Sequence, residues 1–297
     1  MNLTALNHHL KPLDKYLNDN TISEIMINNE KEIFIEKSGI IENIKAPDLT
    51  NNHLNILTKL IANYNGKDLN KDNPSISGVL PNKERVQIVT KPISANNDYI
   101  LSIRKQTLKN VSLDDYQYNI DCQQFIKDAI KDKLNILISG GTNTGKTTFL
   151  NACLLEIPSN ERIITLEDTR EISTIHKNQV NLIAAKETMT DLLETSLRLR
   201  PDRIIMGEIR GIEAASFIEA IATGHDGTLS TIHASSPEFA ITQLAIKAQR
   251  GNMQNLSQQE LIKYIKSLIP VVIQLSRHYD EKTKSIIRYV SEVKYFR

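Results

Sequence analysis

The part of this chain whose residue types and spacing most clearly indicate chemistry is 138–150, which reads ISGGTNTGKTTFL. It contains the pattern G-x-x-x-x-G-K-[ST] of a phosphate-binding loop, formed by Gly140, Gly145, Lys146 and Thr147. Glycines let backbone amides face the phosphates, and the N-terminus of the following helix adds positive potential. We expect Lys146 to reach the β- and γ-phosphates and the Thr147 hydroxyl to ligate Mg²⁺. The predicted nucleotide-binding residues of the loop are Gly140, Gly141, Thr142, Asn143, Thr144, Gly145, Lys146, Thr147 and Thr148.

Acidic residues follow the next apolar run of the chain. The run 163–166 (IITL) predicts a buried strand, and three acids come after it: Glu167, Asp168 and Glu171. Because ligands of open α/β sheets bind beyond the carboxyl ends of strands, these acids are candidates for a metal or an attacking water. Acids are also common in the turn and helix start after any strand, which is the structural alternative.

A second acid and two histidines follow later strands. The run 203–207 (RIIMG) ends at Glu208, as in a Walker B element, although the usual preceding aspartate is missing. We expect Glu208 to act as a base or as an outer ligand of Mg²⁺. The run 228–232 (TLSTI) predicts another buried strand, with His225 before it and His233 at its end. A histidine facing phosphate can stabilise γ-phosphate charge, whereas a lone histidine is usually structural; His233 is the stronger candidate.

Strands and helices must position these residues. Apolar runs of strand length alternate with helical patterns from Leu134 to His233, which predicts an α/β domain with a mostly parallel sheet and helices on both faces. The predicted helices of this part are 148–155, 189–200 and 213–223. The tail beyond Pro237 is expected to be helical, with a last pair of strands at 271–275 and 286–290.

The first half predicts a smaller α+β domain. Its expected elements are helices at 3–17 and 54–64, a hairpin of strands 24–28 and 32–36, and strands 85–90 and 99–104. Arg85 begins one strand and Arg104 ends another, so both are candidates to project toward a neighbouring domain, although solvated surface charge is the simpler interpretation. We place the N-terminal domain at 1–110, a short linker at 111–120 and the domain that contains the phosphate-binding loop at 121–297.

Composition restricts the function classes. The chain of 297 residues has a formal net charge of +1, with 24% charged and 40% hydrophobic residues, which is ordinary for a globular protein and indicates neither a nucleic-acid nor a membrane partner. Cys122 and Cys153 form no C-x-x-C pair, which fits a reducing cytosol. The first residues lack the pattern of a signal peptide, and the run 261–275 is too interrupted to span a bilayer. We therefore expect any membrane association to be peripheral or through a partner.

Four runs occur in a fixed order: GGTNTGKTT, TLEDTREI, LRLRPDRIIMGEIRG and ATGHDGTLSTIHA. They resemble the Walker A, acidic box, Walker B and His box of the secretion ATPase superfamily, in which a lone Glu208 is usual. In the first half, EIMIN, LPNKERVQIV and ILSIRK resemble the N-terminal domain of the conjugation-type (VirB and Trb) ATPases of type IV secretion. The four-cysteine module of the longer type II assembly ATPases is absent. One departure is Lys83, where the family pattern LP-x-G-E-R has glycine.

The resemblance implies a RecA-like P-loop ATPase domain that uses ATP and Mg²⁺. The residues to which it assigns roles are Glu208, Lys146, Glu167 and His233 for catalysis, Thr147 and Glu208 for Mg²⁺, and Arg85 and Arg104 for the phosphates of nucleotide held between the domains.

The resemblance also implies a homo-hexameric ring, peripheral to the cytoplasmic face of the inner membrane. Its expected partners are other type IV secretion ATPases and inner-membrane channel components, and its work is substrate translocation or pilus assembly. Two alternatives stay open: a nucleotide-gated scaffold, and a DNA-translocating P-loop ATPase. Near-zero net charge and few aromatic residues disfavour the latter, so we predict no direct nucleic-acid binding.

Overall fold

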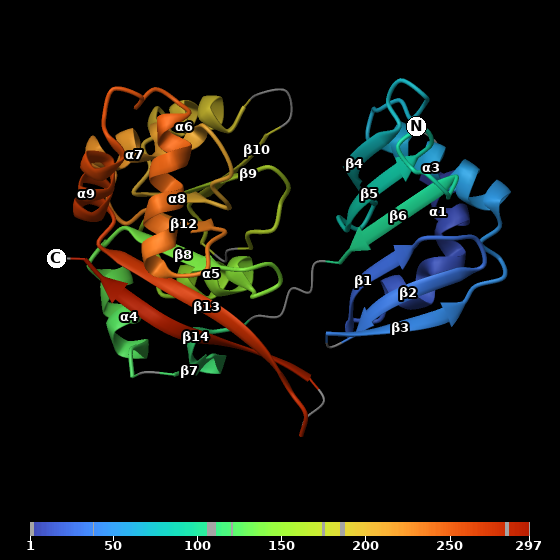
Figure 1. Ribbon diagram of the computed structural model, residues 1–297, viewed down its shortest axis with the longest axis horizontal. Helices are drawn as coiled ribbons and strands as arrows, with labels where there is room; N and C mark the ends of the chain where they lie inside the picture. Colours follow the sequence, from blue (N-terminus) through green and yellow to red (C-terminus); the bar gives the residue numbers. More distant parts are fainter. Residues whose placement is uncertain are drawn as a thin grey trace. The chain divides into compact units, whose positions relative to one another are not determined.

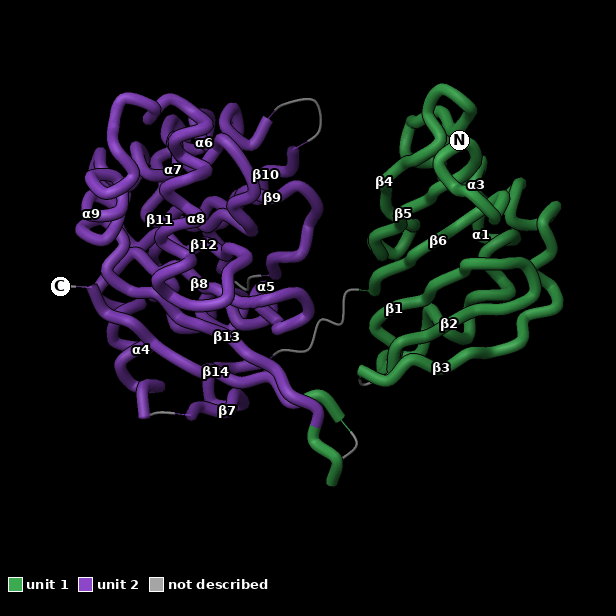
Figure 2. The backbone as a smooth tube through the Cα atoms, in the orientation of Figure 1, with its two compact units in different colours: residues 1–108, 280–286 green, residues 109–279, 287–297 purple. Residues whose placement is uncertain are grey.

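The computed structural model describes residues 3–37, 39–105, 111–119, 121–173, 176–184, 188–282 and 285–296. The chain divides into two compact units, which Figure 2 colours separately. The first unit comprises residues 1–108 and 280–286, and the second comprises 109–279 and 287–297.

The first unit is built on an antiparallel sheet in the strand order β3-β2-β1-β6-β5-β4. The bounds of its elements are α1 Leu3–Leu10, η1 Lys11–Leu13, α2 Asp14–Leu17, β1 Ile22–Ile27, β2 Glu32–Lys37, β3 Ile40–Lys45, α3 Asn51–Tyr64, β4 Ser75–Val79, β5 Arg85–Thr90 and β6 Tyr99–Arg104. Strand β5 buries every second residue, so one face of the sheet is apolar. Leu6 of α1 and Leu57 of α3 share one buried cluster with Ile25 and Ile88 of the sheet. The two helices therefore cover that apolar face.

The predicted hairpin in this unit is confirmed as the antiparallel pair β1–β2. The sheet also contains the edge strands β3 and β4, which the sequence did not predict because β3 is almost wholly exposed and shows no alternation of burial. The predicted helix 3–17 is divided by the 3₁₀ turn η1, which has a proline in its first turn.

The turn between β4 and β5 explains the glycine of the family pattern. Lys83 has a φ of 74°, in the left-handed region that glycine adopts without a steric penalty. Its N–H donates to the carbonyl oxygen of Leu80 at 2.9 Å, and the Leu80 N–H donates to the Glu84 carbonyl oxygen at 2.8 Å. The turn keeps the glycine geometry with a lysine in place.

The second unit contains a sheet in the order β10-β9-β11-β12-β8-β13-β14-β7 (Figure 1). The bounds of its elements are η2 Leu113–Asp115, β7 Gln117–Tyr118, α4 Gln123–Lys131, β8 Ile136–Gly140, α5 Lys146–Leu154, β9 Ile163–Glu167, β10 Gln179–Ile183, α6 Met189–Leu197, β11 Arg203–Met206, α7 Glu213–Ala222, β12 Leu229–Ile232, α8 Pro237–Gln249, α9 Gln258–Leu268, β13 Val271–Asp280 and β14 Ser285–Tyr295. Strands β10, β9, β11, β12, β8 and β13 pair in parallel, so their carboxyl ends meet at one edge of the sheet.

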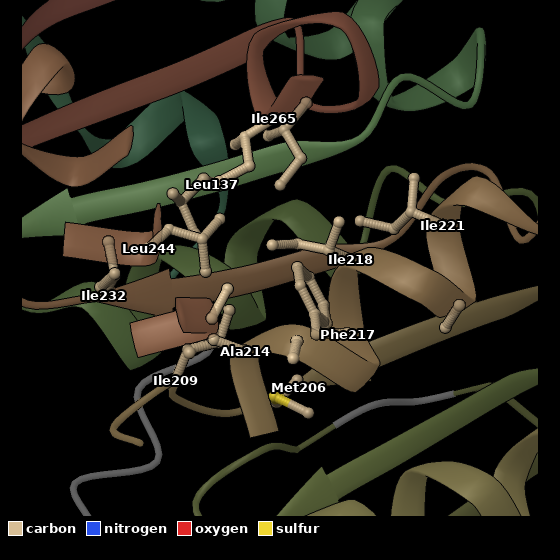
Figure 3. Packing of buried hydrophobic residues seen from close by; sticks show 14 of the residues in the cluster. Leu137, Met206, Ile209, Ala214, Phe217, Ile218, Ile221, Ile232, Leu244 and Ile265 are labelled. Atoms are coloured by element: carbon tan, nitrogen blue, oxygen red, sulfur yellow. The ribbon is translucent and has the colours of Figure 1, made fainter. Parts of the chain in front are cut away.

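Each face of this sheet carries its own core. Leu137 of β8 belongs to the cluster that contains residues of α6, α7, α8 and α9, and Figure 3 shows it with other members, among them Phe217 and Leu244. Its neighbours Ile136 and Ile138 belong to the cluster formed with α4 and α5. Because successive side chains of a strand point to opposite faces, the wholly buried β8 must be covered on both. The predicted α/β arrangement with helices on both faces is confirmed.

Local hydrogen bonds set the helix starts. At α6 the Thr188 hydroxyl accepts from the Asp191 N–H at 3.2 Å, and the Asp191 carboxylate accepts from the Thr188 N–H at 2.8 Å. The same reciprocal capping occurs at α9 between Ser257 and Glu260. These caps satisfy amides that have no partner within the helix.

Residues 111–119, predicted within a linker, lie in the second unit instead. Leu113 is fully buried in its core, and the Tyr118 hydroxyl donates to the Leu113 carbonyl oxygen at 2.7 Å. Strand β7 pairs in parallel with β14, with Gln117 opposite Tyr289. The polar composition of the segment concealed this pairing. None of the helices in the described ranges combines the length and the hydropathy needed to cross a bilayer.

Candidate functional site

The predicted phosphate-binding loop joins the buried strand β8 to helix α5, as the sequence indicated. Two of its residues have left-handed backbone conformations: Asn143 with a φ of 59° and Gly145 with a φ of 85°. A Cβ atom on Gly140 would lie 2.5 Å from the Thr144 hydroxyl oxygen and 2.9 Å from the Leu275 carbonyl oxygen. The neighbouring strand therefore excludes any side chain at Gly140.

Lys146 lies across the loop. Its Nζ donates to the carbonyl oxygens of Gly140 and Gly141 at 3.0 Å each, and the side chain is largely buried. The same Nζ lies 3.2 Å from Nδ1 of His233, at the end of β12. The loop and the His box, separate in sequence, thus meet through one ammonium group.

His233 connects this lysine to the predicted catalytic acid. Its Nε2 lies 3.1 Å from Oε1 of Glu208, which follows β11. Burial, and next the positive charge of Lys146, lower the pKa of His233 below its ordinary value of 6.5, while Glu208 opposes this. The imidazole is therefore neutral at neutral pH. The tautomer that satisfies both contacts carries its proton on Nε2, donates to Glu208 and accepts from Lys146 through Nδ1.

The other oxygen of Glu208 is held by Arg210, a residue that the sequence did not single out. Arg210 places Nε at 3.0 Å and Nη2 at 2.8 Å from Oε2 of Glu208, and its Nη1 at 2.7 Å from Oδ2 of Asp168. The guanidinium thus joins the acidic box to the Walker B carboxylate. Its place two residues after a lone acid was the available signal, because a nearby cation can orient that acid.

The acids after β9 have different roles in the structure. Glu167 is buried, and its Oε1 accepts from the N–H groups of Glu171 and Ile172 at 2.7 Å each. It therefore shapes the turn, whereas Glu171 reaches the loop: its Oε2 accepts from the Thr147 hydroxyl at 2.9 Å. The catalytic role assigned to Glu167 stays a prediction.

The chain also offers oxygen atoms for Mg²⁺. Among the described residues no group of three or more His, Cys, Asp or Glu side chains is arranged to hold a metal ion. Mg²⁺ bound with nucleotide usually takes one or two protein ligands besides water and phosphate. The Thr147 hydroxyl and the Glu171 carboxylate, in contact at the start of α5, fit that requirement. The assignment of Glu208 to the metal stays a prediction.

The remaining candidates are not members of the cluster formed by Lys146, His233 and Glu208. Arg85 and Arg104, in the first unit, face each other as partners in the antiparallel pair β5–β6. His225 caps the end of α7, with Nδ1 3.0 Å from the Ala220 carbonyl oxygen, a structural contact. The roles of Arg85 and Arg104 toward phosphate stay predictions.

A glycine loop with its lysine, followed on adjacent parallel strands by acid and histidine, is the arrangement of P-loop nucleoside triphosphatases with a RecA-like sheet. Fold and site together place the chain in this class. Within this class the chain belongs to one family. The model for the Type II/IV secretion system protein family matches residues 7–295, so the chain is a member of that family.

Individual relatives agree with the family. The type IV secretion system protein VirB11 of Bartonella quintana is 32% identical over 314 residues, covering 90% of this chain and 88% of that protein. The crystal structure of the VirB11 ATPase from the Brucella suis type IV secretion system in complex with sulphate is 30% identical and covers 98% of this chain and 94% of that chain, with a TM-score of 0.54. The Legionella pneumophila ATPase DotB, 21% identical, has a TM-score of 0.71 over 93% of this chain and 78% of that chain and shows the fold alone.

These similarities confirm the family that the four motif runs indicated. The predicted fold class and the predicted enzyme class, an ATP hydrolase of type IV secretion, are confirmed with it.

Proposed function

We propose that this ATPase is a motor, which couples Mg²⁺-dependent ATP hydrolysis to substrate translocation or pilus assembly in a type IV secretion system. The observation that carries the proposal is the contact chain from Lys146 through His233 to Glu208. It joins the group that would bind the γ-phosphate to the carboxylate that would orient water. A change at the phosphates therefore has a direct path to the Walker B strand.

The reaction is in-line displacement at the γ-phosphorus. Loop amides and Lys146 hold the phosphates, and Glu208 orients the attacking water and accepts its proton. The new bond joins the water oxygen to phosphorus, and the bond to the leaving ADP oxygen breaks. Mg²⁺, when bound, neutralises charge on the phosphate oxygens, with Thr147 as its predicted ligand.

Neutral His233 serves this cycle as a sensor. Because the ring has Lys146 Nζ at 3.2 Å from Nδ1 and Glu208 Oε1 at 3.1 Å from Nε2, a shift of the ammonium toward phosphate alters the contact that orients Glu208. Arg210 holds the second oxygen of the carboxylate meanwhile, so the acid keeps its place.

The assembly that we propose is a homo-hexamer, peripheral to the cytoplasmic face of the inner membrane, in contact with other secretion ATPases and channel components. The names of the relatives, which are type IV secretion system proteins, support the part of this proposal that makes the chain a component of a secretion machine. Arg85 and Arg104 would contact the phosphates of the bound nucleotide. Like charges directly opposed on paired strands destabilise a sheet, a cost that a bound polyphosphate would offset.

The test compares phosphate release by the wild type and Glu208→Gln over a range of protein concentrations, with Glu194→Gln on the exposed face of α6 as the matched control. A motor requires that Glu208→Gln bind ATP but lose hydrolysis by about 10²-fold or more, and that the control behave as the wild type. Specific activity that rises with concentration would support the ring.

Export in cells separates motor from scaffold. Cells that carry only Glu208→Gln should lose export, because binding without turnover supplies no work. If export continues, the motor proposal fails and a nucleotide-gated scaffold replaces it.

A further inference from the structure

Strand β14 places an arginine against the outside of the phosphate loop. Nε of Arg288 donates a hydrogen bond to the carbonyl oxygen of Asn143 at 2.9 Å. Its Cδ lies 3.1 Å from the position that a Cβ on Gly145 would occupy. The arginine thus bonds to one of the two loop residues that have left-handed conformations and occupies the space beside the other.

The topology of the sheet brings Arg288 to this place. Strand β13 lies beside β8, with Leu275 in register with Gly140 at the start of the loop, and continues to Asp280. The chain then returns as β14, the next strand of the sheet. Val290 of β14 is fully buried in the core shared with α5. Because residues two apart share a face of a strand, Arg288 extends the same face beyond the core, at the level of the loop.

The hydrogen bond fixes the direction of one peptide group. In a planar trans peptide the C=O and the following N–H point in opposite directions. A donor outside the loop on the Asn143 carbonyl therefore directs the Thr144 N–H toward the inside, where loop amides cradle phosphate. Thr144 is held from the other side by its hydroxyl, which donates to the Gly141 carbonyl oxygen at 2.9 Å.

The loop needs this support because of its backbone. A residue other than glycine at a φ of 59° is in a sparsely populated conformation, which persists only where surrounding contacts impose it. Among the described contacts of the Asn143 backbone, the bond from Arg288 is the one that opposes a flip of the 143–144 peptide.

We infer that Arg288 is a positioning residue for nucleotide binding, which holds the Asn143–Thr144 peptide in its phosphate-binding orientation through Nε. The inference rests on the proposed nucleotide site. It adds to that site a residue of β14, a strand that lies outside the four motif runs. Because the loop amides face the phosphates that ATP and ADP share, the residue supports both nucleotides equally.

Two substitutions of nearly the same shape test this role. In Arg288→Gln the amide Nε2 follows Cδ, as Nε does in arginine, so an N–H donor remains while the charge is lost. In Arg288→Met a methyl group takes that place, so contact with Gly145 remains while the donor is lost. Arg277→Met, on the exposed part of β13, is the matched control for loss of an arginine from the same hairpin.

Equilibrium binding of Mg²⁺–ADP and of a non-hydrolysable Mg²⁺–ATP analogue to the full chain gives the readout. We expect Arg288→Met to weaken both nucleotides about tenfold, and Arg288→Gln and Arg277→Met to stay within about twofold of the wild type. Thermal melting of each variant identifies any loss of folding, and normal binding by Arg288→Gln supports the role even where the methionine variant is unstable.

Three results would overturn the inference: Arg288→Met that binds as the wild type, Arg288→Gln that is weakened as much as Arg288→Met, or a loss confined to the ATP analogue. The second would assign the effect to charge rather than to the hydrogen bond. Failure of the proposed function itself looks different, because the wild type would then bind no nucleotide or Lys146→Ala would bind it normally.

Discussion

Replacing Arg210 with methionine tests whether the orientation of Glu208 is set by its own strand or by the guanidinium beside it. The substitution keeps an unbranched side chain and removes two hydrogen bonds to Oε2 of Glu208, at 3.0 and 2.8 Å. The Glu208 side chain is only 20% exposed, so solvent cannot fully replace them. Charge-assisted bonds of this kind are worth about 1.5–3 kcal/mol, which corresponds to a fall in kcat of roughly 10- to 100-fold.

The partner of Arg210 on its other side supplies a control. The Asp168 side chain is 42% exposed and Arg210 is 55% exposed, so their ion pair contributes about 1 kcal/mol or less. Asp168→Asn should therefore lower kcat by less than about fivefold. The KM for ATP should change little in either variant, because Lys146 and the loop remain.

The pH profile gives a second, independent readout. After burial and Lys146, the charge of Arg210 also lowers the pKa of His233. Its removal therefore raises that pKa. Since protonated His233 cannot accept from Lys146, activity falls as pH falls through the pKa, and the acid limb of kcat/KM in Arg210→Met should lie at higher pH than in the wild type.

The assay is steady-state phosphate release from about pH 5 to pH 8, the range in which histidine titrates, for the wild type, Arg210→Met and Asp168→Asn. Wild-type kcat in Arg210→Met would refute the orienting role of the guanidinium. An acid limb that stays in place would refute the electrostatic link to His233.

Two further predictions follow from close contacts elsewhere in the second unit. Gly140→Ala should abolish nucleotide binding, as measured by equilibrium binding. The added Cβ would lie 2.9 Å from the Leu275 carbonyl oxygen and 2.5 Å from the Thr144 hydroxyl oxygen. Binding within a few-fold of the wild type would show that the loop can move aside. Glu161→Gln should lower the free energy of unfolding by about 3–5 kcal/mol and the midpoint of thermal unfolding by roughly 10 °C. The reason is that the Arg203 guanidinium, whose side chain is 0% exposed, loses the carboxylate that lies 2.5 Å from it. An unchanged melting curve would contradict this.

The parts of the fold that the sequence predicted are those with local signals. The glycine spacing and the apolar run before it predicted β8 and the loop, and Glu208 and His233 were found because each lies within two residues of the end of a buried strand. Strand β10 was not predicted: its Gln179 and Asn181 are polar, and it exists through parallel pairing with β9. Helix α5 begins at Lys146, earlier than the predicted start at Thr148, because Gly145 turns the chain directly into the helix.

The site residues that the sequence missed depend on distant partners. Arg288 lies 145 positions from the carbonyl that it binds, so no spacing rule connects them. Glu171 was recognised as one of three acids, but only the folded turn decides that it, and not Glu167, meets Thr147. Arg85 and Arg104 were found as strand-end charges, and their register as direct partners was a property of the hairpin that follows β5.

The order of strands has a consequence for synthesis. Strand β8 is synthesised early in the second unit, but its neighbours in the sheet, β12 and β13, are synthesised much later. Ile136 can pair only after Leu229 and Val271 have been made. At ordinary translation rates the strand stays unpaired for roughly ten seconds. A mostly apolar unpaired strand is a template for aggregation, and no nucleotide can stabilise the nascent chain before its loop is enclosed. A stop codon between β12 and Val271 therefore yields an aggregation-prone fragment in which the edge of β8 that pairs with β13 is exposed, rather than a weakened ATPase.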